Sequence, residues 1–270
     1  MSRARRVSRL LRWCCSPLAV LAALSARATP EPGLVYVHTA RSGIVMVDTK
    51  APGAPATSVT RGLTFDVSGQ SFSVPDQSPL VLVLSSGTAI FVPTGGNFTL
   101  EQFTQEPVVD TGRDREYEPT ASNLSLRLTN GTFAFAERIP VPSSTLTIST
   151  PLAELSGQSR SFVLQVGADK LSIAVFEGVV KLTVPSTGFA ETLQSGQYVT
   201  LQRSALAQSY PLQLANIGVV QQHDLGEWLD MARWAEARVD FARSGDKLHP
   251  RLILPVDFTT QISAEEARYQ

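Results

Sequence analysis

The chain has 270 residues, of which 43% are hydrophobic and 17% are charged, and its formal net charge is -1 at pH 7. This composition excludes a collagen, a coiled coil and a disordered polyelectrolyte, because each of those classes needs a far stronger bias. No apolar run reaches the roughly 18 residues of a membrane-spanning helix, which excludes a polytopic membrane protein. The chain also lacks the basic surplus of nucleic-acid-binding proteins, so we expect no nucleic-acid partner.

Residues 1–28 have the order of a secretory signal peptide. Five arginines and no acidic residue precede a short apolar stretch, Pro17–Leu24, and a small-x-small cleavage sequence ends at Ala28. We expect cleavage near Ala28, a mature chain that starts at Thr29 without an integral membrane segment, and a periplasmic or secreted location. An uncleaved N-terminal anchor is the alternative interpretation.

Removal of the leader would change the net charge and the cysteine content of the chain. Residues 29–270 contain 17 basic and 24 acidic residues, a net charge of -7, and no cysteine, because Cys14 and Cys15 both lie in the leader. Disulfide bonds and thiol catalysis are therefore excluded, and the fold depends on its hydrophobic core. The 242 remaining residues are enough for one large or two small domains.

Alternating apolar and polar residues dominate the sequence from residue 34 to about residue 202, which is the pattern of half-buried β-strands. Within it, x-Gly pairs separate alternating segments at Gly43, Gly87, Gly131 and Gly178, which are 44, 44 and 47 residues apart. Such pairs are typical of hairpin turns, because glycine accepts the positive φ that these turns need. We predict four hairpins in a mainly β fold, either an antiparallel two-layer β-sandwich or a short β-solenoid. The spacing fits a repeated unit, and it equally fits an all-β chain without a repeat.

One amphipathic α-helix is predicted over residues 224–244, between a linker at 204–223 and a C-terminal tail at 245–270. Asp224 and Glu227 have the spacing of a capping box. Apolar residues then recur at helical spacing; they are Leu225, Trp228, Leu229, Ala232, Ala235, Val239 and Ala242.

Trp234 and Phe241 point away from this stripe and are our candidate partner-binding residues. The alternative is that the apolar residues at 252–256 cover them within the chain, because exposed aromatic side chains are costly to leave in water.

Residues 105–123 are rich in charge and contain two prolines, which predicts a long surface loop. Its segment Val108–Gly112 matches the core sequence of aspartic proteases, in which two such loops bring two carboxylates together. This chain has one such segment, so we interpret Asp110 as structural and keep a single-lobe aspartic hydrolase as a minor alternative. The three histidines lack the spacing of zinc ligands, and we predict no metal and no cofactor.

Residues 58–203 resemble the FecR-type periplasmic domain, with 29–57 as an N-terminal β segment of the same module. The motifs that carry the resemblance follow one another in the family's order; they are Ser149-Thr150-Pro151, Phe162–Val166, Ile173–Val180 with its Glu177-Gly178 pair, and Gly196-Gln197. One departure is the stretch Gly157–Phe162, which is longer than the family's "GT-x-F" and lacks its threonine.

The resemblance implies an extracytoplasmic, non-enzymatic all-β module that engages an envelope protein or polysaccharide. Well-known members of the family are anti-sigma regulators with a membrane span. The alternative function is therefore a component of a cell-surface signalling system that acts with a separate transmembrane or sigma-factor partner.

Overall fold

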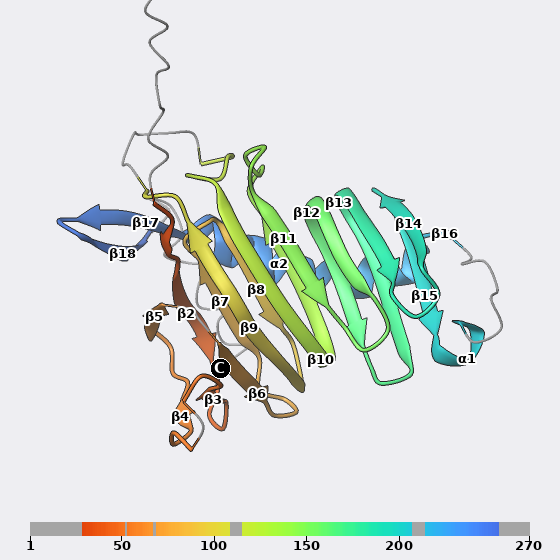
Figure 1. Ribbon diagram of the computed structural model, residues 1–270, viewed down its shortest axis with the longest axis horizontal. Helices are drawn as coiled ribbons and strands as arrows, with labels where there is room; N and C mark the ends of the chain where they lie inside the picture. The colour runs from red at the N-terminus through yellow and green to blue at the C-terminus, as the bar shows by residue number, and fades with distance from the viewer. Residues whose placement is uncertain (1–28, 52, 67–68, 109–114, 207–213, 254–270) are drawn as a thin grey trace, which may run out of the picture.

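The computed structural model describes residues 29–51, 53–66, 69–108, 115–206 and 214–253. These residues form a mainly β fold with one long helix, as the sequence predicted (Figure 1). No helix among them is long and apolar enough to span a membrane. The predicted signal peptide and Asp110 lie outside the described residues.

Figure 1 labels the elements in chain order. The strands are β1 (Glu31–Pro32), β2 (Leu34–Ala40), β3 (Val45–Asp48), β4 (Thr57–Ser58), β5 (Thr64–Asp66), β6 (Gln70–Val74), β7 (Leu80–Leu84), β8 (Thr88–Val92), β9 (Gly96–Gln105), β10 (Ser122–Glu137), β11 (Thr145–Ser149), β12 (Glu154–Val166), β13 (Lys170–Val184), β14 (Phe189–Gln194), β15 (Gln197–Gln202), β16 (Ala215–Asn216), β17 (Val239–Ser244) and β18 (Lys247–Leu252). The helices are α1 (Arg203–Leu206) and α2 (Val219–Arg238).

Sixteen strands form one hydrogen-bonded sheet, which folds into two layers because its long strands change partners midway. The first part of β10, up to Gly131, pairs with β9, whereas the part after Gly131 pairs with β8 and β12. In the same way β13 pairs first with β15 and then with β14. The strands of this sheet pair in antiparallel fashion, except that the first part of β10 pairs with β11 in parallel.

We name the two layers by what covers them. The helix layer contains β2, β5, β7, β8, β15, β16, the second parts of β10 and β12, and the first part of β13. The open layer contains β1, β3, β4, β6, β9, β11, β14, the first parts of β10 and β12, and the second part of β13. This arrangement is the predicted sandwich, with α2 added on one side.

The main core lies between the two layers and is built from the inward residues of the alternating strands. Phenylalanines dominate its centre: Phe72 stacks on Phe98 with ring centroids 4.8 Å apart, and Phe135 stacks on Phe162 at 4.6 Å. Each fully buried side chain of this size stabilises the fold by about 1.5–3 kcal/mol.

A second core lies between the helix layer and α2, which Figure 1 shows running behind the strands. The helix buries Leu225, Leu229, Ala232 and Ala235 against small side chains of the sheet, among them Ala134. Strands of this layer are therefore buried on both faces, which explains why β7 is apolar at every position instead of alternating.

The prediction of four hairpins is wrong at three of its four glycines, although all four have the positive φ that the pattern indicated. Only Gly87 closes a hairpin, between β7 and β8. Gly43 connects β2 to β3, which pair with different neighbours, and Gly131 and Gly178 lie inside β10 and β13. A positive φ bends a strand from one layer to the other as readily as it reverses the chain, so the local pattern is the same for both.

The helix exists as predicted, but its bounds differ from residues 224–244. It begins at Val219, where the N–H of Gly218 donates to the side-chain oxygen of Gln221 at 3.1 Å, and it ends at Arg238. The next six residues form β17, which pairs with β18 in the predicted tail. Val239 and Phe241, on either side of Asp240, lie buried in the second core, and this burial favours the strand.

Candidate functional site

The described part of the charged stretch at 105–123 lies only partly on the surface: Glu106, Glu116 and Tyr117 are exposed, but Glu118 is buried. The N–H of Glu118 donates to the carbonyl oxygen of Ile139 at 2.9 Å, and the N–H of Ile139 donates to that of Glu116 at 2.8 Å. These two bonds bind the segment to the chain that follows β10. The side chain of Glu118 consequently points inward, and the residue is 5% exposed.

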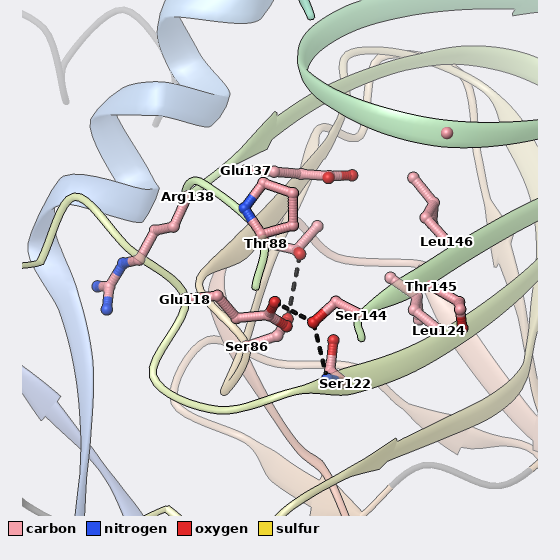
Figure 2. A pocket seen from close by; sticks show the side chains of 12 residues that line it. Ser86, Thr88, Glu118, Ser122, Leu124, Glu137, Arg138, Ser144, Thr145 and Leu146 are labelled. Atoms are coloured by element: carbon pink, nitrogen blue, oxygen red, sulfur yellow. Dashed lines mark hydrogen bonds between the residues drawn. The ribbon is translucent and has the colours of Figure 1, made fainter. Parts of the chain in front are cut away.

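Glu118 enters a small polar pocket at the end of the sandwich (Figure 2). Its cavity of about 20 Å³ is the size of one water molecule. The full lining consists of Ser86, Thr88, Glu118, Ser122, Leu124, Glu137, Arg138, Pro140, Ser144, Thr145, Leu146 and Gly157.

Hydrogen bonds hold Glu118 in place. Its Oε2 accepts from the hydroxyl of Ser144 and from the N–H of Val141, the latter at 3.2 Å. The Ser144 hydroxyl oxygen in turn accepts from the N–H of Ser122 at 3.1 Å, a connection visible in Figure 2. Burial raises the pKa of Glu118 above its ordinary value, and the hydrogen bonds of Ser122, Ser144 and Val141 oppose that rise.

Glu137 is the second acidic residue of the pocket. Its Oε1 is inaccessible to solvent and has no hydrogen-bond partner among the described residues. Burial, and then the negative charge of Glu118, raise the pKa of Glu137 to about 8. The carboxyl group is therefore mostly protonated at pH 7, and a protonated carboxyl is a hydrogen-bond donor as well as an acceptor.

The next residue, Arg138, turns its guanidinium away from the pocket toward the end of α2, as Figure 2 shows. Its Nε donates to Oε1 of Glu236 at 2.7 Å, and its Nη1 donates to Oδ1 of Asp240 at 3.4 Å. Its Nη2 also donates to the carbonyl oxygen of Val239 at 3.4 Å. Arg138 thus joins the strand that carries the pocket to the helix and to β17.

The chemistry that this pocket supports is the uptake and release of a proton. Its polar groups are carboxyl, hydroxyl and backbone groups, together with the ion-paired Arg138. Within the described ranges, no group of three histidine, aspartate, glutamate or cysteine side chains is placed to hold a metal ion. Asp110, the residue of the hydrolase alternative, lies outside those ranges, so its structural role stays a prediction.

Sequence reasoning missed both glutamates, although one of them has a signal. In the run Phe133–Glu137, the two phenylalanines face the main core, so period 2 also places Glu137 on the inward face. Glu118 has no comparable signal, because it belongs to an irregular segment whose course depends on distant backbone partners.

Trp234, one of the candidate partner-binding residues, packs against the helix layer. Its ring makes an edge contact with the ring of His38, with centroids 4.9 Å apart. The guanidinium of Arg238 lies 4.0 Å from the centre of the Trp234 ring. Burial, and then the charges of Arg61 and Arg238, lower the pKa of His38 to about 4, so this histidine is neutral in the folded protein at pH 7.

Phe241, the other candidate, is 9% exposed and belongs to the second core. Of the expected cover, Leu252 is itself 52% exposed, and residues 254–256 lie outside the described residues. Both aromatic residues pack in the second core, against the helix layer. Binding of a partner by Trp234 and Phe241 stays a prediction.

A second candidate site is the outer face of the open layer, which we call the open face. Its polar side chains align across strands in two registered rows. The first row consists of Ser71, Thr99, Arg127, Ser149, Glu154 and Thr183, and the second of Ser125, Thr147, Ser156, Lys181 and Thr192.

Several side chains of the open face bond to one another. Nε of Arg127 donates to Oε1 of Glu101 at 2.6 Å, and the Thr99 hydroxyl donates to that of Ser71 at 3.2 Å. Beside the first row, Nδ2 of Asn97 donates to Oδ1 of Asn130 at 2.8 Å. The face is therefore hydroxyl-rich and internally ordered.

Comparisons with known proteins find a distant structural likeness. No protein-family model matches the sequence, and no curated protein matches it. Two crystal structures, at 2.50 and 1.65 Å, of a "putative anti-sigma factor" from Parabacteroides distasonis ATCC 8503 each resemble the fold, with 11% sequence identity and a TM-score of 0.40. The match covers 68% of this chain and 99% of that chain. At this distance the resemblance concerns the mainly β architecture.

Proposed function

We propose that this chain is an exported, FecR-like binding module that docks an envelope protein or polymer on its open face and catalyses no reaction. The observation that supports this proposal is the contrast between the two outer faces of the sandwich. In the helix layer, α2 covers the outer face with apolar contacts. In the open layer, the outer face presents two rows of polar side chains that cross its strands in register.

The composition of the open face suits a polar interface. Serine and threonine lose little side-chain entropy when they become ordered, and the hydrogen bonds within the face order several of them in advance. The charged pair Arg127–Glu101 is already formed before a partner arrives. A partner that supplies its own hydroxyl, amide or backbone groups can thus bind this face without a large ordering cost.

Some residues of the motifs behind the resemblance lie at turns and bends of the fold, whereas Phe162–Val166 and most of Ile173–Val180 lie along β12 and β13. Thr150 and Pro151 lie between β11 and β12, Gly178 is the bend of β13, and Gly196 precedes β15. These positions shape the sandwich, and they support membership of the same structural class. The partner surface therefore has to be sought on the exposed rows between them.

Site-specific photo-crosslinking tests the proposal. We expect a cross-linking amino acid at Ser156, an exposed member of the second row, to capture a discrete component of an envelope extract. The same group at the exposed Gln222 of α2 is the control and should capture nothing in common with it. The proposal also requires that Lys181→Glu, next to Ser156 in the row, weaken the capture.

Three results would contradict this assignment: the same component captured at Gln222, no component captured at Ser156, or capture unaffected by Lys181→Glu. If the captured component is a membrane-spanning signalling protein, the module belongs to a signalling system. If it is a polymer or a structural envelope protein, the module is a scaffold.

A further inference from the structure

Strand β14 is an unusual edge of this sheet. The other strands at the ends of the sixteen-stranded sheet within the described residues are β1, β4, β5 and β16, with only two or three residues each. Strand β14 has six residues, pairs on one side with β13, and contains neither lysine nor proline. A long edge without these residues offers backbone groups to another strand, which natural proteins usually prevent.

Two side chains occupy two of the backbone donors of this edge, those of Thr192 and Gln194. The N–H of Thr192 donates to Oε1 of Glu191 at 3.1 Å, and the N–H of Gln194 donates to Oε1 of Gln197 at 2.7 Å. In a strand, the N–H groups of alternate residues point to the same side. The two bonds therefore cap successive donors along the edge that faces away from β13.

We propose that β14 is a latent strand-pairing surface that fits the β14 of a second copy of this chain, and that Glu191 and Gln197 keep it closed. The inference does not rest on the proposed function. It rests on the length of the edge and on the two capping side chains. Once the side chains of Glu191 and Gln197 are removed, the backbone N–H groups of Thr192 and Gln194 can bond to another strand.

The residues of β14 are self-complementary in one antiparallel register. Centred on Thr192, this register places Ala190 opposite Gln194 and Glu191 opposite Leu193. Each residue therefore lies opposite a residue from the same face of the strand. The neighbouring register centred on Glu191 would place two carboxylates opposite each other, which is unfavourable. Pairing in the first register would join the two open layers and continue the second row, which ends at Thr192.

The test compares the wild-type mature chain with the double variant Glu191→Ala/Gln197→Ala by analytical ultracentrifugation. We expect the wild type to be monomeric and the double variant to dimerise, with a dissociation constant lower by at least about tenfold. The matched control is Glu154→Ala/Gln222→Ala, which removes the same two residue types from exposed positions away from the edge and should remain monomeric.

Two additions locate the contact. Ala190→Lys in the double variant places a charge on the edge and should restore the monomer. Thr192→Cys in the double variant should form a disulfide between copies, because directly paired residues lie about 4.5–5.5 Å apart and residues 29–270 contain no other cysteine.

The proposal is overturned if the double variant, shown to be folded by circular dichroism, stays monomeric. It is also overturned if the dimer persists when Ala190→Lys is added to the double variant. A disulfide between copies of the single variant Thr192→Cys, in which Glu191 and Gln197 are intact, would overturn it as well.

Discussion

At the scale of single residues, Gly131 shows why this fold needs glycine inside a strand. Its φ is 114°, a backbone conformation that other residues rarely adopt, and it marks the point where β10 changes partners. A Cβ at this position would lie 2.5 Å from the carbonyl oxygen of Gly95 and 2.7 Å from Cα of Gly96. Both obstacles are backbone atoms, so a side chain cannot be accommodated by a change of rotamer.

We predict that Gly131→Val lowers the free energy of unfolding by about 1–3 kcal/mol, from backbone strain together with this collision. Urea denaturation of the mature chain measures it. Gly226→Ala is the control, because nothing lies within 4 Å of a Cβ at that helix position. It should leave stability unchanged or raise it by up to about 1 kcal/mol. Equal stability of the Gly131 variant and the wild type would contradict the strain argument.

Glu137 predicts a pH dependence of stability. Burial raises its pKa from an ordinary 4.5 to about 8 in the folded protein, so the folded state binds more protons than the unfolded state between these values. Stability should therefore fall as the pH rises from about 4.5 to about 8. The raised pKa of Glu118 acts in the same direction.

The variant Glu137→Gln tests this, because glutamine is neutral at every pH. Relative to the wild type, we expect its melting temperature to be higher by several degrees at pH 8 and similar at pH 5, where about 2–4 °C corresponds to 1 kcal/mol for a chain of this size. Thermal unfolding followed by circular dichroism provides the measurement. A constant difference between the two pH values would show that Glu137 does not titrate in the folded state.

At the scale of elements, the attachment of α2 depends on apolar packing and on ion pairs, among them the pair of Arg233 with Glu177 and a cluster around Arg138. The helix contributes Leu225 and Leu229 to the second core. Arg138, whose side chain is 6% exposed, pairs with Glu236 at the end of the helix and with Asp240 in β17. The cluster thereby connects the helix, the hairpin β17–β18 and the strand that carries Glu137.

Arg138→Ala should lower the free energy of unfolding by about 1–3 kcal/mol, because it leaves the partly buried carboxylate of Glu236 without its partner and leaves Asp240 with Arg115 alone. Arg203→Ala is the comparison, since Arg203 pairs with Asp169 at the surface, where both side chains are more than half exposed. That pair should contribute less than about 1 kcal/mol. Urea denaturation of both variants gives the two values, and similar losses would argue against a special role for the Arg138 cluster.

At the scale of the whole molecule, the described fold begins with β1, directly after the predicted leader. Glu31 in β1 accepts a hydrogen bond from Arg243 in β17, which ties the start of the sandwich to the C-terminal hairpin. A leader that is removed at Ala28 would leave this contact and the rest of the sandwich intact.

We predict that the protein recovered from an exporting host begins at Thr29 and is found outside the cytoplasm. N-terminal sequencing together with cell fractionation checks both points. Recovery of an intact Met1 on cytoplasmic protein would refute export, and an intact Met1 on membrane-bound protein would favour the uncleaved anchor.

Much of the architecture was predictable because it depends on local periodicity. Period-2 alternation identified the β-rich region, and helical spacing identified Leu225, Leu229, Ala232 and Ala235 as the buried stripe of a helix. The positive φ of Gly43, Gly87, Gly131 and Gly178 followed from their neighbours in sequence. The end of the helix could not be predicted from neighbouring residues, because the strand conformation of Val239–Ser244 depends on pairing with β18 and on burial against the sheet.

The sequence by itself therefore determined the class of fold, the one long helix, the candidate leader and the absence of thiol chemistry after its removal. Those properties depend on composition and on spacing within about twenty residues. Only the tertiary structure decided which glycines reverse the chain and which bend it between layers, and which face of the sandwich lies under α2. It also decided that Glu118 and Glu137 share a pocket, because the environment of a carboxyl group comes from chain segments that are distant in sequence and adjacent only after folding.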